Sequence, residues 1–496
     1  MTRQREFFQI TKYARRYDRQ TGKFIVNIGY ETATDITPRT IAVHEAFGLG
    51  VDQSQRHVIY DNVELKISPR DVVLITGESG SGKSVLLREL ESDIRQDLGL
   101  DAINIADVIV DPDKPLIDTV GKTLEEGLEL LSRVGLNDAF LFVRRYNQLS
   151  DGQKYRYRIA KMIEESQAQF WIADEFCSTL DRDTAKIVAF NLQKLARQEA
   201  KAVLAATTHT DLFEDLKPSI HIHKRFGKEI EVKYYPNEVN RKCSLVREMR
   251  IKPGTLEDYR RLAGFHYRDS KGIVACQKVF VLKRGEEVAG VIVYSSPAVA
   301  AFGRKKAFGR QFSLEELNRD VALISRVVVH PKYRTIGLGV KLVKETLHLA
   351  GRPYVETVAV MARYNPFFEH AGLTRIEESK SEPRILEAVE KLRTLGFNPI
   401  FLSSEKGNLE KLQKMPAHEV EQVKNIFKEV SRSSGVYRKR IMSVREAYLT
   451  HEQFCTRVDR ASLEKLARML RILGFLTQTK VYLYWKRHSG ITQDSL

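Results

Sequence analysis

One stretch of this sequence decides the fold: Gly77-Glu78-Ser79-Gly80-Ser81-Gly82-Lys83-Ser84. Residues 71–76 before it form the continuous apolar run of a central strand, and residues 84–90 after it have the apolar spacing of a helix. A glycine-rich loop that ends in Lys-Ser between a strand and a helix is a P-loop. Its glycines let backbone N–H groups point at phosphate oxygens, Lys83 neutralises the β- and γ-phosphates, and the Ser84 hydroxyl can ligate Mg²⁺. The stretch therefore predicts a nucleoside triphosphate site, and ATP is the simplest ligand.

Two carboxylates follow a second predicted strand. Residues 170–173 are apolar, and Asp174 and Glu175 come directly after them. A bare Asp-Glu pair at the end of a strand is usually a solvated turn. Together with a P-loop, the pair suits Asp174 to the Mg²⁺ shell and Glu175 to polarising the attacking water. Residues 57–67 alternate in polarity and predict a further, half-buried strand.

Between these motifs lies Leu149-Ser150-Asp151-Gly152-Gln153, which resembles the signature of the ABC ATPase family. The resemblance continues in the family's order through a basic helix at residues 154–163, a D-loop at residues 178–181, and a switch histidine, His209, after Thr207 and Thr208. The resemblance implies an α/β fold with an ABC-type P-loop ATPase domain. It also implies that Glu175 and His209 are catalytic.

In the ABC ATPase family, the signature of one copy contacts the ATP that is held by the P-loop of a second copy. The sequence has one P-loop and one signature, so the resemblance implies a head-to-tail homodimer with two ATP molecules, or a heterodimer with a related chain. Asp113 stands where the family usually has a glutamine, and either Phe47 or Tyr60 is the candidate for stacking on the base. The predicted ATP-binding residues are Gly77, Glu78, Ser79, Gly80, Ser81, Gly82, Lys83, Ser84, Asp113, Ser150, Gly152 and Gln153, with Ser84 and Asp174 as ligands of Mg²⁺.

A second glycine turn occurs in the other half of the chain. Residues 245–251 and the hairpin at residues 278–294 are predicted strands, and residues 322–329 form another that runs into Arg334-Thr335-Ile336-Gly337-Leu338-Gly339. An amphipathic helix is predicted at residues 340–347. A basic glycine turn between a strand and a helix can hold pyrophosphate at the helix N-terminus, with Arg334 assisting from the side, although such turns are often purely structural.

The surroundings of this turn resemble the GNAT acetyltransferases, through Arg334-x-x-Gly337-x-Gly339, residues 358–361 and residues 365–373. In that family the strand before the turn, here with Val327 and Val329, pairs with the pantetheine arm of acetyl-CoA. Phe368 occupies the position of a frequent tyrosine general acid, so Tyr364 and His370 become the neighbouring candidates. The resemblance implies acetyl-CoA binding by Val327, Val329, Arg334, Thr335, Gly337, Leu338, Gly339, Asn365 and Phe368.

The predicted fold is thus an ABC-type ATPase domain with a basic N-terminal segment (residues 1–240), a GNAT mixed-sheet domain (241–376) and a basic, mainly helical C-terminal region (377–496). Helices are predicted at residues 386–397 and 463–475. The strand-like residues 481–487 favour a small winged-helix-like module, with residues 438–440 as a nucleic-acid contact. Solvated helices that pack on the GNAT domain are the alternative.

Charge points to a polyanionic partner. The chain has 80 lysines and arginines against 64 acidic residues, a net charge of +16 and a pI near 9.4. Residues 3–19 mix cations with aromatic rings, which suits a nucleic-acid groove, or equally an amphipathic element with its rings in the ATPase core. Neither a run of 18 apolar residues nor a secretory signal is found, so we expect a soluble cytoplasmic protein without a membrane partner or a transport role.

Together the two halves predict an ATP-gated acetyltransferase that acts on amines of RNA or DNA and uses ATP, Mg²⁺ and acetyl-CoA. One alternative is acetylation of a protein or a small amine under control of the ATPase, although a polyamine pocket should be acidic. The other is a non-catalytic, ATP-driven nucleic-acid clamp with a coenzyme-sensing GNAT domain.

Overall fold

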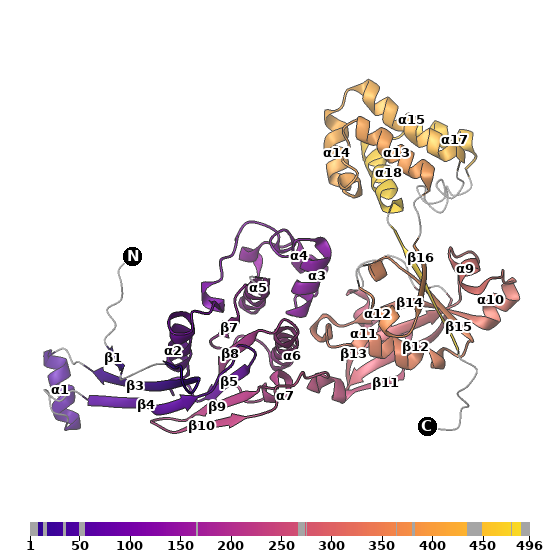
Figure 1. The fold of residues 1–496 in the computed structure, drawn as a ribbon. Helices are drawn as coiled ribbons and strands as arrows, with labels where there is room; N and C mark the ends of the chain where they lie inside the picture. The colour runs from indigo at the N-terminus through magenta and orange to yellow at the C-terminus, as the bar shows by residue number, and fades with distance from the viewer. Residues whose placement is uncertain are drawn as a thin grey trace. The chain divides into compact units, whose positions relative to one another are not determined.

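The structure is a computed structural model, and it describes residues 8–12, 17–32, 36–48, 55–164, 167–265, 273, 275–363, 365–378, 382–433, 449–477 and 479–487. Figure 1 labels the elements along the chain, and the chain divides into two compact units. The first comprises Met1–Ile273, Lys278–Val293 and Arg326–Leu342, and the second comprises Val274–Gln277, Tyr294–Ser325 and Val343–Leu496. The predicted coenzyme turn at residues 334–339 therefore belongs to the same unit as the P-loop.

A six-stranded sheet carries the P-loop. Its strand order is β10-β9-β5-β8-β7-β6, and β5 pairs in parallel with both β8 and β9. The strands are β5 (Val72–Gly77), β6 (Ala102–Asn104), β7 (Phe170–Ala173), β8 (Ala202–Thr207), β9 (Ile220–Lys224) and β10 (Ile230–Tyr234). Because β5, β7 and β8 are parallel neighbours, their carboxyl ends bring the P-loop, Asp174 and Thr207 to one edge of the sheet.

Strand β5 is buried on both faces, as its continuous apolar run predicts. Val72 and Leu74 belong to an apolar core that includes residues of α5 (Asp151–Glu164) and α6 (Arg182–Gln198). Val73 and Ile75 belong to a second core that includes residues of α2 (Lys83–Gln96). Adjacent residues of the strand thus anchor the P-loop to helices on opposite faces of the sheet.

A smaller antiparallel sheet belongs to the same unit. Strand β3 pairs with β1, β2 and β4. The strands are β1 (Phe8–Lys12), β2 (Tyr17–Asp18), β3 (Lys23–Thr32) and β4 (Gln55–Leu65), and the helices not yet named are α1 (Pro38–Phe47), α3 (Leu124–Arg133), α4 (Ala139–Phe142) and α7 (Phe213–Leu216). Strand β4 confirms the strand predicted at residues 57–67.

A mixed sheet follows, with the strand order β11-β12-β13-β14-β15-β17-β16. The strands are β11 (Met249–Pro253), β12 (Cys276–Arg284), β13 (Glu287–Ser295), β14 (Val321–Val329), β15 (Tyr354–Ala359), β16 (Thr374–Glu378) and β17 (Val481–Lys486), and the helices are α8 (Leu256–Ala263), α9 (Arg304–Phe308), α10 (Leu314–Asp320), α11 (Leu338–Thr346) and α12 (Phe367–His370). The predicted hairpin and the predicted strand–turn–helix are confirmed.

The strand predicted at residues 245–251 is wrong in its first part. Ser244–Glu248 forms a 3₁₀ helix, and β11 begins at Met249. Asp215 holds the start of this turn, because its carboxylate accepts hydrogen bonds from the backbone N–H of Ser244 at 2.8 Å and from the Ser244 hydroxyl at 2.6 Å. A contact with a residue of α7 therefore overrides the alternating pattern.

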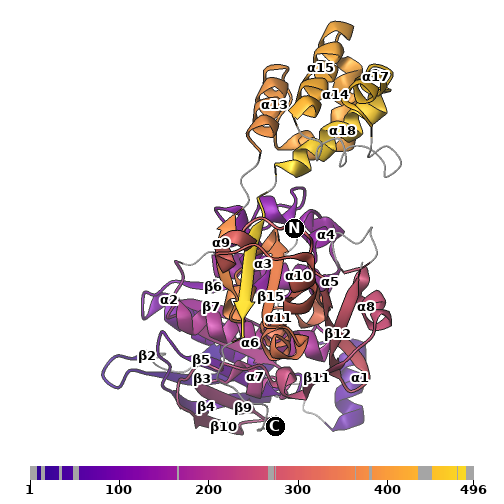
Figure 2. The ribbon, with the colours of Figure 1, turned by 90° about the vertical axis from the view of Figure 1, so that its right-hand side faces the viewer.

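Strand β17 also differs from the prediction of a winged-helix-like module. It lies between β15 and β16 and is antiparallel to both, and it is the yellow arrow near the label β15 in Figure 2. Val481, Tyr482 and Leu483 are fully buried there. The predicted C-terminal strand is thus part of the mixed sheet.

The helices between β16 and β17 share one apolar core. They are α13 (Pro383–Thr394), α14 (Glu405–Lys414), α15 (Ala417–Ser433), α17 (His451–Asp459) and α18 (Leu463–Leu476). Helices α13 and α18 confirm the two helices that the sequence predicts in this region. Among the helices that the structure describes, none has the length and apolar character needed to span a membrane.

Candidate functional site

The P-loop has a backbone conformation that requires glycine. Gly77, Gly80 and Gly82 have φ values of +149°, +78° and +101°, in the region that side chains disfavour. A Cβ atom on Gly77 would lie only 2.0 Å from the backbone oxygen of Lys224, and one on Gly82 only 2.7 Å from a methyl carbon of Ile59. The loop can therefore pass close to β4 and β9 only with glycine at these positions.

Lys83 holds the loop closed. Its Nζ donates hydrogen bonds to the backbone oxygens of Gly77 at 2.9 Å and Glu78 at 2.7 Å, and the residue is only 8% exposed. Burial lowers the pKa of Lys83, and the nearby Asp174 carboxylate partly opposes this shift. The ammonium group thus lies at the loop, where a phosphate would compensate its lost hydration.

A cavity of about 410 Å³ adjoins the P-loop. It brings together seven residues that the sequence predicts to act there, namely Ser79, Gly80, Gly82, Lys83, Ser84, Asp174 and Glu175. The sequence analysis missed the other lining residues, which are Ile59, Val85, Ser178, Ala206, Thr207 and Thr208. Ser178 belongs to the predicted D-loop, and Thr207 and Thr208 directly precede the predicted switch histidine, so these two motifs were the available signal.

These residues fit a phosphate ligand and Mg²⁺. The Ser81 hydroxyl is buried in the loop and, among the described residues, has no hydrogen-bond partner, as expected where a phosphate oxygen binds. The Ser84 hydroxyl and the Asp174 carboxylate line the same cavity and are hard oxygen ligands of the kind that Mg²⁺ takes. When bound, Mg²⁺ would neutralise phosphate charge beside Lys83.

Glu175 lies in a strained backbone conformation, with a φ of +48°. Its backbone N–H donates a hydrogen bond to Asp174 Oδ1 at 2.9 Å. The two adjacent carboxylates are thereby held at the carboxyl end of β7, and both line the cavity. The roles of Asp174 as a metal ligand and of Glu175 in polarising the attacking water stay predictions.

Other predicted nucleotide residues lie outside the lining of this cavity. Asp113 is exposed in a turn, where its backbone N–H donates to Asp111 Oδ1 at 3.0 Å. The backbone N–H of His209 donates to Thr207 Oγ1 at 3.2 Å, and burial lowers the pKa of the His209 imidazole. The nucleotide roles of Asp113 and His209 stay predictions.

The signature residues start helix α5. Gln153 Oε1 accepts a hydrogen bond from the backbone N–H of Ser150 at 3.1 Å. A Cβ atom on Gly152 would lie 3.2 Å from a methyl carbon of Leu180, which places this glycine against the predicted D-loop. The contact of Ser150, Gly152 and Gln153 with ATP of a second copy stays a prediction.

The two candidates for a base-stacking aromatic lie in different surroundings. Phe47 is 77% exposed at the end of α1, whereas Tyr60 is fully buried and donates a hydrogen bond from its hydroxyl to the backbone oxygen of Gly82 at 3.0 Å. Ile59, the neighbour of Tyr60 on β4, lines the cavity. Tyr60 therefore stabilises the P-loop through this hydrogen bond to Gly82.

The predicted coenzyme turn connects β14 to α11. Thr335 and Gly337 have φ values of +73° and +86°. A Cβ atom on Gly337 would have no atom within 4 Å, so open space lies beside the turn. The first backbone N–H groups of α11 have no partner within the helix and fit a pyrophosphate group at its N-terminus.

Arg334 is held by backbone oxygens. Its guanidinium donates hydrogen bonds to Val329 O at 3.0 Å, to Phe265 O at 3.4 Å, and to Asn137 O. These contacts fix the turn to the end of β14 and to the segment between α3 and α4. The predicted contact of Arg334 with a pyrophosphate stays a prediction.

The pairing of β14 with β15 covers only the first part of β14. The register runs from Val321 opposite Tyr354 to Leu323 opposite Glu356, and the Thr357 hydroxyl then donates to the backbone oxygen of Ile324 at 3.1 Å. The hydrogen bond from Thr357 thus takes the place of backbone pairing where β14 continues toward the glycine turn. Val327 and Val329, which are predicted to pair with pantetheine, lie half-buried beyond this point.

In the second unit, Phe368 packs against its neighbour. The rings of Phe367 and Phe368 lie 4.0 Å apart, and Phe368 is only 5% exposed. Asn365 and His370 are exposed, and Tyr364 lies outside the described residues. The coenzyme contacts of Asn365 and Phe368 stay predictions.

Comparison with known proteins agrees with both halves. The model of the Acetyltransferase (GNAT) family matches residues 244–372. The cytochrome c biogenesis ATP-binding export protein CcmA of Gluconobacter oxydans is 31% identical over 169 residues, which are 31% of this chain and 76% of that protein. The phosphonates import ATP-binding protein PhnC 1 of Cupriavidus metallidurans is 26% identical over 215 residues, 34% of this chain and 74% of that protein.

Among solved structures, a dimeric ATP-binding cassette in a post-hydrolysis state with ADP and phosphate is similar over 36% of this chain and 92% of its own, with 20% identity and a TM-score of 0.30. The sheet, the P-loop and the lining of the cavity define a P-loop ATPase. The chain belongs to the ABC ATPase family, and a GNAT acetyltransferase domain is fused to its ATPase.

Proposed function

We propose that this protein is an ATP-gated acetyltransferase that transfers the acetyl group of acetyl-CoA to an amine of RNA or DNA. The observation that carries the proposal is the glycine turn at residues 334–339. It lies inside the region matched by the acetyltransferase family, and it shares a compact unit with the nucleotide cavity. In the transfer, the amine nitrogen attacks the thioester carbonyl carbon, the C–N bond forms, the C–S bond breaks, and the thiol of coenzyme A leaves with the proton of the amine.

The proposed acceptor rests on charge. A net charge of +16 favours a polyanion and disfavours a cationic polyamine. Two segments are predicted to contact nucleic acid, residues 3–19 and residues 438–440. Residues 438–440 and most of residues 3–19 lie outside the described residues. The basic helix at residues 154–163 also carries aromatic residues, but its Tyr157 is fully buried and contacts Thr119 through its hydroxyl at 2.6 Å, which supports a structural role for this helix.

Gating requires a second copy of the chain. Among the described residues, those that line the cavity come from β4, the P-loop, the start of α2, the segment from the end of β7 to Ser178, and the residues at the end of β8, and they do not include Ser150, Gly152 or Gln153. A signature that stands apart from the cavity of its own chain supports a head-to-tail dimer in which each copy completes the site of the other.

The proposal is tested with radiolabelled acetyl-CoA, offered with ATP to the purified protein in separate mixtures with RNA, DNA, protein extract and polyamines. Label in nuclease-sensitive material supports the proposal, and label confined to protein or to small amines overturns the acceptor class. The Lys83→Ala variant tests gating, because its transfer should fall together with its ATP affinity.

A non-catalytic role is the second candidate, and one observation favours it. Phe368 occupies the place of a frequent general acid, has no ionisable group, and is buried. A clamp with a coenzyme-sensing domain would bind acetyl-CoA in calorimetry but would transfer label to none of the four mixtures.

A further inference from the structure

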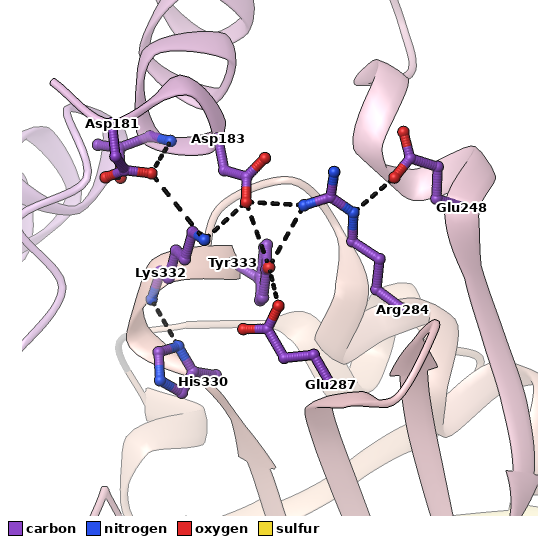
Figure 3. A network of polar contacts seen from close by, with 9 residues as sticks. Asp181, Asp183, Glu248, Arg284, Glu287, His330, Lys332 and Tyr333 are labelled. Atoms are coloured by element: carbon purple, nitrogen blue, oxygen red, sulfur yellow. Dashed lines mark hydrogen bonds and ion pairs between the residues drawn. The ribbon is translucent and has the colours of Figure 1, made fainter.

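Asp183, in the first turn of α6, gathers three side chains of the mixed-sheet region around one oxygen atom (Figure 3). Its Oδ2 accepts hydrogen bonds from Lys332 Nζ at 2.6 Å and from a guanidinium nitrogen of Arg284 at 2.7 Å, and it lies 3.4 Å from the Tyr333 hydroxyl. Lys332 and Tyr333 belong to the turn that leads from β14 to the glycine turn. All of these residues lie in the first unit.

A surrounding set of carboxylates completes this cluster. The Tyr333 hydroxyl donates to Glu287 at 2.7 Å, Arg284 Nε donates to Glu248, and Lys332 Nζ lies 4.0 Å from Asp181 Oδ1 (Figure 3). Burial disfavours ionisation of Asp183, yet the bonds from Lys332 and Arg284 outweigh it and hold the pKa of this carboxyl below its usual value. The side chain of Asp183 is only 15% exposed, so these contacts are screened less than a surface ion pair.

A second, neutral anchor joins the same helix to the glycine turn itself. Asn191 Nδ2 donates hydrogen bonds to the Thr335 hydroxyl at 2.9 Å and to the backbone oxygen of Arg133 at 2.7 Å. Asn137 Nδ2 donates to the backbone oxygen of Pro331 at 3.3 Å, beside the contact of Arg334 with Asn137 O. Thr335 has a left-handed backbone two residues before Gly337, so Asn191 acts where the turn is most constrained.

The chain segment that carries Asp183 begins in the nucleotide cavity. Asp174, Glu175 and Ser178 line that cavity. Three residues beyond Ser178, Asp181 caps α6 through hydrogen bonds from the backbone N–H of Thr184 at 3.1 Å and the Thr184 hydroxyl at 2.6 Å. If bound nucleotide displaces Ser178, the displacement can pass along five residues of the chain, through the capped start of α6, to Asp183. The carboxylate of Asp183 binds Lys332.

We propose that Asp183 is a positioning residue for the coenzyme turn, and that residues 174–183 relay the nucleotide state of the ATPase to acetyl-CoA binding. The relay rests on the proposed function, because it names the residues through which ATP gates the acetyltransferase. Asp183 orients Lys332 and Tyr333 at the start of the turn, and Asn191 supports Thr335 within it. Coupling of two ligands through such an element changes each affinity by the same factor.

The test measures the Kd for acetyl-CoA by calorimetry on the full chain, with and without a non-hydrolysable ATP analogue. In the wild-type protein, the analogue should change this Kd by about fivefold or more, and acetyl-CoA should change the Kd of the analogue equally. Asp183→Asn should reduce both changes to less than about twofold, with the affinity for the analogue itself retained. Asp183→Glu should restore part of the coupling, because it keeps the carboxylate.

The Asp183→Asn variant should fold, because Arg284 keeps Glu248 and Lys332 keeps Asp181 as a partner. Glu238→Gln is the matched control, since it removes an exposed carboxylate that pairs with Lys217 in the same unit, and it should leave the coupling unchanged. Unaltered coupling in Asp183→Asn, or its absence in the wild-type protein that binds both ligands, overturns the relay alone. Failure of the wild-type protein to bind acetyl-CoA overturns the proposed function as well.

Discussion

At the scale of single residues, Lys83 combines structural and ligand-binding roles. Its ammonium group is buried, its pKa is lowered by that burial, and its described partners include two backbone oxygens of the P-loop. A phosphate would supply the negative charge that these carbonyl groups lack. Lys83 is therefore the residue at which loss of a side chain should affect ATP most directly.

Lys83→Ala should weaken ATP binding by about 10- to 100-fold, because a hydrogen bond to a charged group contributes about 1.5–3 kcal/mol. Isothermal titration calorimetry with Mg-ATP measures the effect. Lys66→Ala, which removes an exposed lysine before β5, is the control and should bind ATP like the wild-type protein. An unchanged affinity of Lys83→Ala for ATP would show that the phosphates do not bind at this P-loop.

Residue-scale prediction succeeds where chemistry is contiguous in the sequence. The P-loop and the Asp174–Glu175 pair could be found because each is a short motif beside a recognisable strand, and both line the cavity. Asp183 and Asn191 could not be found, because their contacts join α6 to residues more than a hundred positions later. Their local sequence is that of an ordinary helix with a polar first turn.

At the scale of elements, the coenzyme turn requires a left-handed backbone at Gly337. Gly337→Val should weaken acetyl-CoA binding by about 5- to 30-fold, because a side chain in the left-handed region costs about 1–2 kcal/mol. ATPase activity should be retained, and calorimetry and phosphate release measure the two quantities separately. Gly48→Val is the control, since Gly48 has a similar φ of +67° and equally open surroundings at the end of α1.

A buried cluster of three side chains joins α9, β15 and β17. Arg304 of α9 donates to Glu356 of β15 through two nitrogen atoms, at 2.9 Å and 2.5 Å, and the Tyr482 hydroxyl of β17 donates to the same carboxylate at 2.7 Å. Arg304 is 6% exposed and Glu356 1% exposed. Water cannot replace either partner there, so each depends on the other.

Glu356→Ala should lower the free energy of unfolding by about 3–5 kcal/mol, because it leaves the Arg304 guanidinium buried without a carboxylate. Asp320→Asn, which weakens the ion pair with the exposed Arg319, should cost less than about 1 kcal/mol. The thermal midpoint and hydrogen exchange in β15 and β17 measure both changes. Equal effects of the two substitutions would show that the buried pair contributes no more to the free energy of unfolding than the pair of Arg319 and Asp320.

Prediction of elements fails where a strand pairs with a distant part of the chain. Residues 481–487 have the alternation of a strand, and the sequence predicts a strand-like end there, but its partner β15 lies more than a hundred residues earlier. Local pattern cannot choose between a small module and a place in the mixed sheet. The turn at Ser244 shows the same limit, because Asp215 comes from α7.

At the scale of the whole molecule, the proposed dimer follows from the separation of the signature from the cavity. Glu175→Gln should bind ATP without hydrolysing it, because the amide cannot polarise the attacking water, and the variant should accumulate as a dimer. Size-exclusion chromatography with light scattering, in ATP and in ADP, measures the mass. A monomer in ATP would contradict the dimer, and Ser150→Arg in the same background should prevent dimerisation.

The position of β17 also has a consequence for biosynthesis. A ribosome makes the chain from its N-terminus, so the strands around the P-loop emerge early and can fold while translation continues. The mixed sheet must wait, because the strand between β15 and β16 is made only after the helices α13 to α18. A premature stop codon shortly before Val481 would therefore release a protein whose nucleotide cavity has formed but whose acetyltransferase sheet lacks the strand between β15 and β16.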